Sequence, residues 1–455
     1  MAGEAGVQPE LYRADYVIGP VGDDPLGVIP DGAIVTGGDR ILFAGPRAAG
    51  EARFPGVPRT DYGPAVISPG FVNAHMHLYG VLAHGLKAPA PIRSFEGFLG
   101  DYWWPLVENQ LDPPMLAAAA ECSGLELIDS GVTALCDCME APLAPRAGLE
   151  AQAAVLERLG VRAVLSVEAS ERISPQNGRL CLRENGEFLA ARRNHPRVSA
   201  SLCLHTAFTC SRSFIEEALG LAEDLDADIQ VHLNESAYEP AWCVERLGKR
   251  TALWYEELGL LSGRLIAAQC VQLSPEEIDA LARAGVRPVH VPLSNCEVGG
   301  GIAPAPALLD RGLPLALGTD GYINNFFAVM RGAFLIHKGY LQSADVMSAK
   351  TVWNMATACG ARAVFGDREK TGTLAPGYGA DFIVISIGDI PSEISPENLF
   401  EQLVLYRNPP DVRDVFAAGR ALKKDGVLRT GDKVEAAGRS RRESARLREA
   451  GLRQV

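Results

Sequence analysis

The stretch Ala65-Val-Ile-Ser-Pro-Gly-Phe-Val-Asn-Ala-His-Met-His-Leu78 decides how the rest of the chain is interpreted. It is an apolar, β-branched run that ends in two histidines, His75 and His77, one residue apart. Because side chains alternate along a strand, the two imidazoles of an H-x-H pair lie on one face. Two neutral ring nitrogens at the end of a strand can bind one divalent ion. The alternative interpretation of this motif alone is a pair of surface histidines.

Downstream of this stretch, apolar strand-like segments alternate with segments of helical periodicity. Several expected helices begin behind a cap, as at Ser274, or end at a glycine, as at Gly160 and Gly285. The expected strands are 66–74, 132–136, 163–167, 200–204, 229–233, 265–270, 286–291 and 313–317. Eight strands alternating with helices predict a (β/α)8 TIM barrel, whose active site lies at the C-terminal ends of the strands. A doubly wound sheet is the competing fold, but no G-x-G-x-x-G motif follows an early strand.

Both ends of the chain instead have short strands separated by turns rich in Gly, Pro and Asp. We expect residues 1–66 and 372–430 to join in one small β domain, with the barrel at 67–371 inserted between them. Residues 431–455 are rich in arginine and predict a basic C-terminal helix. We expect that helix to pack on its own domain or on a neighbouring subunit.

Composition narrows the classes of function. The chain has 455 residues, 47% of them hydrophobic, and a net charge of −13, which argues against a nucleic-acid partner. No apolar run approaches the ~20 residues of a membrane span, and the first residues lack the features of a signal peptide. The ten cysteines include no C-x-x-C pair, which is typical of reduced thiols in a cytoplasmic protein.

Candidate ligands and catalysts recur at the ends of the expected strands. His232 closes the strand 229–233 and is followed by Glu235, and Asp320 follows the strand 313–317. A lone histidine is usually a core residue and a lone aspartate a cap, so the recurrence carries the argument. Three imidazoles and one carboxylate from different strand ends predict a hydrolytic metal site with room for water.

These motifs together resemble the amidohydrolase superfamily. The resemblance covers residues 68–384 and is closest to the branch of deaminases and chlorohydrolases (the ATZ/TRZ type) that act on adenosine derivatives, guanine, 8-oxoguanine and s-triazines. It implies a distorted (β/α)8 barrel, a composite β-sandwich domain and one zinc or iron per subunit. The motifs that carry it are His75-x-His77, His232-Leu-Asn-Glu235, Pro292-Leu-Ser-Asn-Cys-Glu-Val-Gly-Gly-Gly-Ile-Ala-Pro304, Gly318-Thr-Asp-Gly321 and Met355-Ala-Thr-Ala-Cys-Gly-Ala361.

The resemblance also implies roles for single residues. The ion would be held by His75, His77, His232 and Asp320. A divalent metal lowers the pKa of its bound water to ~7, and the resulting hydroxide would attack the ring carbon that bears the leaving group. Asp320 would take the proton of that water, and Glu235 would protonate the ring nitrogen and then the departing amine.

The sequence departs from the family in two places. Gln269 stands where the family has a histidine that faces the attacking water, and glutamine cannot carry a proton. Val107 stands where adenosine-type deaminases have a ribose-binding glutamate, with Glu108 one position later. The neighbouring Trp103-Trp104 pair is similar to aminohydrolases without a settled nucleoside substrate. The expected substrate contacts are Trp104, Glu108, His205, Gln269 and Asn295, and Gln269 is also a candidate catalytic group.

We therefore predict a metal-dependent aminohydrolase, a hydrolase of C–N bonds other than peptide bonds that deaminates a small nitrogen heterocycle of the cyclic amidine type. Removal of chloride, sulfur or an alkylamine, or hydrolysis of a cyclic amide, is the alternative on the same scaffold. A non-catalytic binding barrel has only Gln269 in its support. We expect one divalent metal per subunit, zinc with iron or manganese as alternatives, and a cytoplasmic homodimer or higher homo-oligomer with no membrane or nucleic-acid partner.

Overall fold

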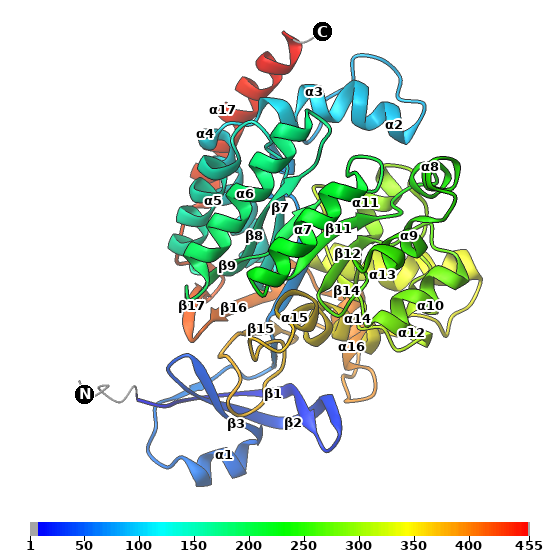
Figure 1. Ribbon diagram of the computed structural model, residues 1–455. Helices are drawn as coiled ribbons and strands as arrows, with labels where there is room; N and C mark the ends of the chain where they lie inside the picture. The colour runs from blue at the N-terminus through cyan, green and yellow to red at the C-terminus, as the bar shows by residue number, and fades with distance from the viewer. Residues whose placement is uncertain (1–7, 454–455) are drawn as a thin grey trace.

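The computed structural model describes residues 8–453, which form a parallel barrel and a separate sheet (Figure 1). The barrel strands are hydrogen-bonded in the order β14-β13-β12-β11-β10-β8-β7-β6, with β9 beside β8. An isolated parallel bridge between Met76 and Asp320 connects the first strand to the segment after the last. The predicted (β/α)8 barrel is therefore confirmed. Its strands are β6 (Phe71–Met76), β7 (Val132–Met139), β8 (Arg162–Ala169), β9 (Val198–Ala200), β10 (Leu202–Leu204), β11 (Ile229–Leu233), β12 (Leu265–Gln269), β13 (Arg287–His290) and β14 (Ala316–Leu317).

The helices of the barrel region form where the sequence provides caps. Helix α10 begins with a capping box in which Ser274 and Glu277 bond each other's backbone, and it ends at Gly285 with φ +69°. The helices are α2 (Phe95–Gly97), α3 (Trp104–Leu106), α4 (Pro113–Asp129), α5 (Pro145–Leu159), α6 (Pro175–Arg192), α7 (Arg212–Asp224), α8 (Tyr238–Leu247), α9 (Thr251–Leu258), α10 (Pro275–Ala284), α11 (Pro292–Glu297), α12 (Ala305–Asp310), α13 (Phe326–Leu341), α14 (Ala349–Ala356) and α15 (Ala358–Phe365). Short irregular turns η1 (Leu78–Ala83), η2 (Phe98–Trp103) and η3 (Glu108–Gln110) lie between β6 and α4.

The second sheet combines both ends of the chain, as the sequence predicts. Its path is β18-β17-β16-β15-β5-β1-β2-β3, with β4 beside β1, so the C-terminal strand β15 pairs with the N-terminal strand β5. The strands are β1 (Glu10–Val21), β2 (Asp24–Gly37), β3 (Arg40–Pro46), β4 (Arg59–Asp61), β5 (Ala65–Pro69), β15 (Phe382–Ser386), β16 (Val412–Ala417), β17 (Arg420–Lys424) and β18 (Val427–Leu428). Around them lie α1 (Arg47–Arg53), α16 (Leu399–Tyr406) and η4 (Pro409–Asp411). The domain limits given in the sequence analysis stay predictions.

The expected single strand 66–74 is two strands that belong to different sheets. β5 pairs with β15 and β1 in the terminal sheet, whereas β6 pairs with β7 in the barrel. The chain changes sheet at Gly70, where a Cβ would lie 2.2 Å from Thr133 Oγ1, so only glycine fits. The stretch that ends in the two histidines therefore connects the two sheets.

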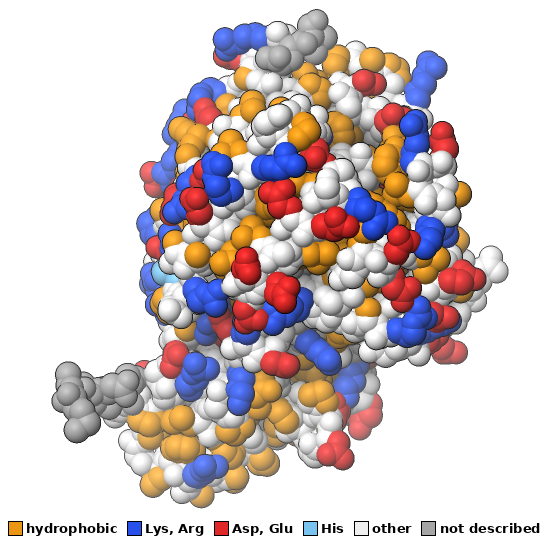
Figure 2. Space-filling model, viewed as in Figure 1, with side chains coloured by type: hydrophobic (Ala, Val, Ile, Leu, Met, Phe, Trp, Pro, Cys, Tyr) orange, Lys and Arg blue, Asp and Glu red, His pale blue; other side chains and the backbone are white. Residues whose placement is uncertain are grey.

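The last helix, α17 (Lys433–Leu452), lies along α4 at the edge of the barrel (Figure 1). Arg439 of α17 pairs with Glu121 of α4 at 2.7 Å, and Ser444 donates to the carbonyl of Leu82 in η1. The expected basic tail is thus a helix over its described residues and packs on its own chain. On the face shown in Figure 2, acidic and basic side chains are interspersed over the barrel. No helix within residues 8–453 is long and apolar enough to cross a membrane.

Candidate metal centre and its cavity

Three imidazoles converge at the C-terminal ends of β6 and β11. The ring centroids of His75, His77 and His232 are 5.0 to 5.4 Å apart, and all three side chains are buried. His77 Nε2 lies 3.4 Å from His232 Nε2 and 3.0 Å from Asp320 Oδ1. These separations are those of ligand atoms around one small ion. The structure therefore brings together the four residues that the sequence predicts as metal ligands.

Hydrogen bonds from the far side of two rings direct their Nε2 atoms inward. His77 Nδ1 donates to the carbonyl of Cys138 at 2.7 Å, and His75 Nδ1 donates to Gln230 Oε1 at 3.1 Å. Such bonds fix the tautomer of a ligating histidine. His75 Nε2 is left buried with no hydrogen-bond partner, which is costly unless a ligand occupies that position. The donor set thus fits a divalent metal.

Asp320 has its two oxygens engaged differently. Oδ1 faces His77, while Oδ2 accepts hydrogen bonds from Gln269 Nε2 and Ser294 Oγ, each at 2.8 Å. Burial would raise the pKa of Asp320, but the hydrogen bond and charge of His77, followed by Gln269, hold it well below its usual range. Asp320 is therefore a carboxylate fixed in one orientation.

The backbone of these strand ends is unusual. Gln269 has φ +75°, Asp320 has φ +56° and Asn234, next to the end of β11, has φ +51°. Non-glycine residues rarely adopt this left-handed region, and such strain is concentrated at functional sites. At each position the backbone turns sharply where the strand ends at the cavity.

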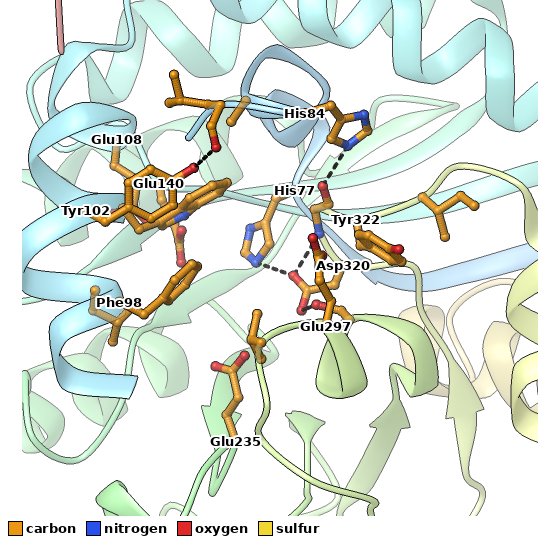
Figure 3. Close-up of a pocket in the computed structure, with 18 of the residues that line it drawn as sticks. His77, His84, Phe98, Tyr102, Glu108, Glu140, Glu235, Glu297, Asp320 and Tyr322 are labelled. Carbon is orange, nitrogen blue, oxygen red and sulfur yellow. Dashed lines mark hydrogen bonds and ion pairs between the residues drawn. The ribbon is translucent and has the colours of Figure 1, made fainter. Parts of the chain in front are cut away.

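Glu235 enters the cavity from the loop after β11, below His77 and Asp320 in Figure 3. The Gly-rich segment predicted from the sequence packs against its backbone, because a Cβ at Gly300 would lie 2.4 Å from the Glu235 carbonyl oxygen. Burial, and then the charge of Asp320, raise the pKa of Glu235 well above its ordinary value. Both effects favour the protonated carboxyl that a general acid requires.

The cavity above the metal centre has a volume of about 1210 Å³. Phe98 and Trp103 line it and stack on each other with centroids 5.6 Å apart (Figure 3). Trp104 and Asn295 are not among the described residues that line it: Trp104 lies beside a second cavity under Arg172, and Asn295 is fully buried. The residues expected at the site that do line it are His77, Glu108, His205, His232, Glu235, Gln269 and Asp320.

The sequence analysis missed a group of acidic residues beside the histidines. Glu140 follows β7 and Glu168 lies near the end of β8, and both are buried. Tyr79 donates a hydrogen bond to Glu140, and Glu108 is paired with Arg172 at 2.7 Å. The same argument from strand ends that found His232 and Asp320 would have found Glu140 and Glu168, but single glutamates form no recognisable motif.

Burial sets the protonation of the imidazoles. It lowers the pKa of His75 to about 4 and, together with the charge of His75, holds the pKa of His232 well below its ordinary value. Burial would also lower the pKa of His77, but the charges of Glu140 and Asp320 raise it well above its ordinary value. His75 and His232 are therefore neutral, as metal ligands must be.

The chain belongs to the amidohydrolase family, whose model matches residues 66–422. It is 33% identical over 437 residues to a 5-methylthioadenosine/S-adenosylhomocysteine deaminase of Syntrophus aciditrophicus, covering 94% of this chain and 95% of the relative. It is 30% identical to a 5'-deoxyadenosine deaminase of Methanopyrus kandleri, covering 92% and 96% of the two chains. Its fold is similar to the crystal structure of an adenosine deaminase from Xanthomonas campestris with bound zinc, with a TM-score of 0.85, 26% identity and coverage of 97% and 98%.

Proposed function

We propose that this chain is a metal-dependent aminohydrolase that removes an amino group from a small, planar nitrogen heterocycle. The observation that carries the proposal is the convergence of three buried imidazoles and Asp320 at the floor of a cavity that Glu235 also enters. The similarity to several deaminases over nearly the full length of the chain supports the reaction type.

His75, His77, His232 and Asp320 would hold one divalent ion, and three nitrogens with one oxygen suit zinc, with iron or manganese as alternatives. Such an ion, when bound, activates a water molecule for attack on an electrophilic carbon. The bound zinc of the similar adenosine deaminase supports zinc as the first choice.

The protein residues supply orientation and proton transfer. Gln269 and Ser294 hold Asp320 through Oδ2, so that Oδ1 stays directed at the histidines. Glu235 would donate its proton to a ring nitrogen and then to the departing amine, which is too basic to leave unprotonated. Phe98 and Trp103 offer an apolar wall against which a flat ring can stack.

Glu108 bears on which heterocycle is bound. Its carboxylate already accepts a hydrogen bond from Arg172 at 2.7 Å and lies 3.4 Å from the Tyr79 hydroxyl. A glutamate engaged in this way is a poor ligand for ribose hydroxyls. We therefore place free aminopurines, aminopyrimidines, pterins and s-triazines first among substrates, and adenosine derivatives second.

A substrate screen with purified, metal-loaded protein tests the proposal. We expect release of one ammonia per molecule of hydroxylated or keto product, with the new oxygen derived from labelled water. Turnover of chloro or thio analogues alone would replace deamination by the alternative leaving groups, and no turnover by metal-loaded protein across the screen would contradict the proposal. The cytoplasmic location and homo-oligomeric assembly expected from the sequence remain predictions.

A further inference from the structure

Glu140 and Glu168 are two buried carboxylates without a cationic partner. They are 6% and 4% exposed, and within residues 8–453 no lysine or arginine forms a salt bridge with either. The nearby Arg172 is already paired with Glu108. Burying two unpaired carboxylates side by side is costly, so the pair calls for a neutralising group.

Two unpartnered atoms point to where that group binds. Glu168 Oε2 and His232 Nδ1 are both buried, neither has a hydrogen-bond partner, and they lie 3.7 Å apart. His205 Nδ1 is hydrogen-bonded to Thr209 Oγ1 at 2.8 Å, which fixes the ring and leaves its other nitrogen available as a ligand. One potential ligand atom from each of four buried residues lies within 4.8 Å of the other three; the four are Glu140, Glu168, His205 and His232.

We propose that Glu140, Glu168 and His205 hold a second divalent cation, beside the first and separated from it by His232. Two carboxylates carry the charge that one divalent ion neutralises, because Glu108 and Arg172 neutralise each other. Two oxygens and an imidazole nitrogen suit zinc, manganese or ferrous iron. The proposal concerns the same cavity as the proposed function, but it does not depend on which reaction occurs there.

Glu140 can connect the two sites. Its carboxylate also belongs to a second group of mutually close ligand atoms that includes His77 and His232. His232 Nε2 lies 4.0 Å from Glu140 Oε1, while the opposite ring nitrogen faces Glu168. Paired ions held close together by shared residues are a common arrangement in metallohydrolases. The two sites would therefore form one binuclear centre.

Metal stoichiometry tests the proposal without any substrate. Purified protein would be incubated with excess Mn²⁺ and passed over a gel-filtration column, and its metal content measured by elemental analysis. We expect two equivalents in the wild type, with an electron paramagnetic resonance spectrum of a coupled Mn²⁺ pair. Glu168→Gln should bind one equivalent and lose the coupling. Glu297→Gln, which changes an exposed acid at the same cavity, should keep two.

Thermal unfolding of each variant shows whether it has folded, and His205→Asn replaces Glu168→Gln if the latter has not. One equivalent in the wild type and in Glu168→Gln alike would overturn the proposal, because the two glutamates would then share a proton instead. Two equivalents in both would place the second ion elsewhere and would also overturn it. Metal counts are read separately from ammonia release, so failure of the proposed function leaves this result interpretable.

Discussion

Gln269 shows how one residue can alter a site whose other residues match the family. Its amide nitrogen donates to Asp320 Oδ2 at 2.8 Å, and its carbonyl oxygen is buried without a partner. The donor is therefore directed at the protein's own carboxylate, and the acceptor remains available for an N–H of the substrate or a water. A histidine in this place could add a positive charge, whereas glutamine adds only a dipole.

We expect Gln269→Ala to lower kcat at least about tenfold, because a hydrogen bond to an ionised group contributes roughly 1.5–3 kcal/mol. Gln269→His should not raise kcat, since the strand end is fitted to an amide that holds Asp320. Steady-state kinetics of the two variants on one substrate provide the comparison. A histidine variant faster than wild type, with alanine equal to wild type, would show that Gln269 is a decayed catalytic position.

Glu235 gives a second prediction at the scale of the residue. It enters the cavity but is not one of the four expected ligands, so Glu235→Gln should keep the metal while kcat falls by ~10² or more. His75→Asn, by contrast, should lose the metal. Elemental analysis and turnover measured on the same preparations separate the two roles. Normal turnover of Glu235→Gln would assign proton transfer to another group.

The sequence predicted most residues of the metal centre because each follows an apolar strand. It could not predict their partners. Gln230, which orients His75, lies inside a strand, and Ser294 reaches Asp320 from a helix elsewhere in the chain. It also placed Trp104 at the cavity, whereas the structure places Trp103 there, because the register of the irregular turn η2 cannot be derived from periodicity.

Among the elements, the turn η1 positions the loop that follows β14. A Cβ on Gly80 would lie 2.4 Å from the Gly321 carbonyl oxygen and 2.7 Å from its Cα, and these are backbone atoms that cannot move aside alone. The contact connects the residue after Asp320 to the turn after His77. Close packing of two backbones therefore fixes the distance between two expected ligands.

Gly80→Ala should accordingly displace the Asp320 loop, weaken metal binding and lower the melting temperature. Gly220→Ala is the matched control: it lies in α7, where a Cβ meets nothing within 4 Å, and alanine there should stabilise by up to ~1 kcal/mol. Thermal unfolding and metal titration of both variants test the expectation. An unchanged metal affinity in Gly80→Ala would show that the loop adapts.

The alternation of strands and helices, and the joining of the two chain ends, could be predicted from hydrophobic patterns and turn residues. The division of 65–76 into β5 and β6 could not, because both strands are apolar throughout and only contacts distant in sequence separate them. Gly70 accepts the change of sheet because of Thr133, and Asp381 accepts the hydrogen bond of its amide. Periodicity contains no information about such contacts.

On the scale of the whole molecule, buried ion pairs connect the terminal sheet to the barrel. Arg162 of β8 donates to Asp381, next to β15, at 3.0 Å, and Lys423 of β17 pairs with Asp129 at the end of α4 at 2.7 Å. All four groups come from segments far apart in the sequence. The terminal sheet is therefore attached to the barrel at several places and not only through β5 and β6.

The closure of the barrel has a thermodynamic consequence. Asn73 of β6 and Thr319 bond each other through both side chain and backbone although they are 246 positions apart, and the expected ligands His75, His77 and Asp320 lie directly beside this seam. An ion bound there would crosslink the first and last strands, so its binding free energy would add to the stability of the closed barrel. Chelation should then accelerate amide hydrogen–deuterium exchange first at β6 and the segment 316–321, before β8 on the opposite part of the sheet is affected. Uniform acceleration over all strands would show that the ion stabilises the barrel without closing it. If the seam opens first, the metal is a structural crosslink of the fold as well as a reagent, and the metal-free chain is a partly open barrel.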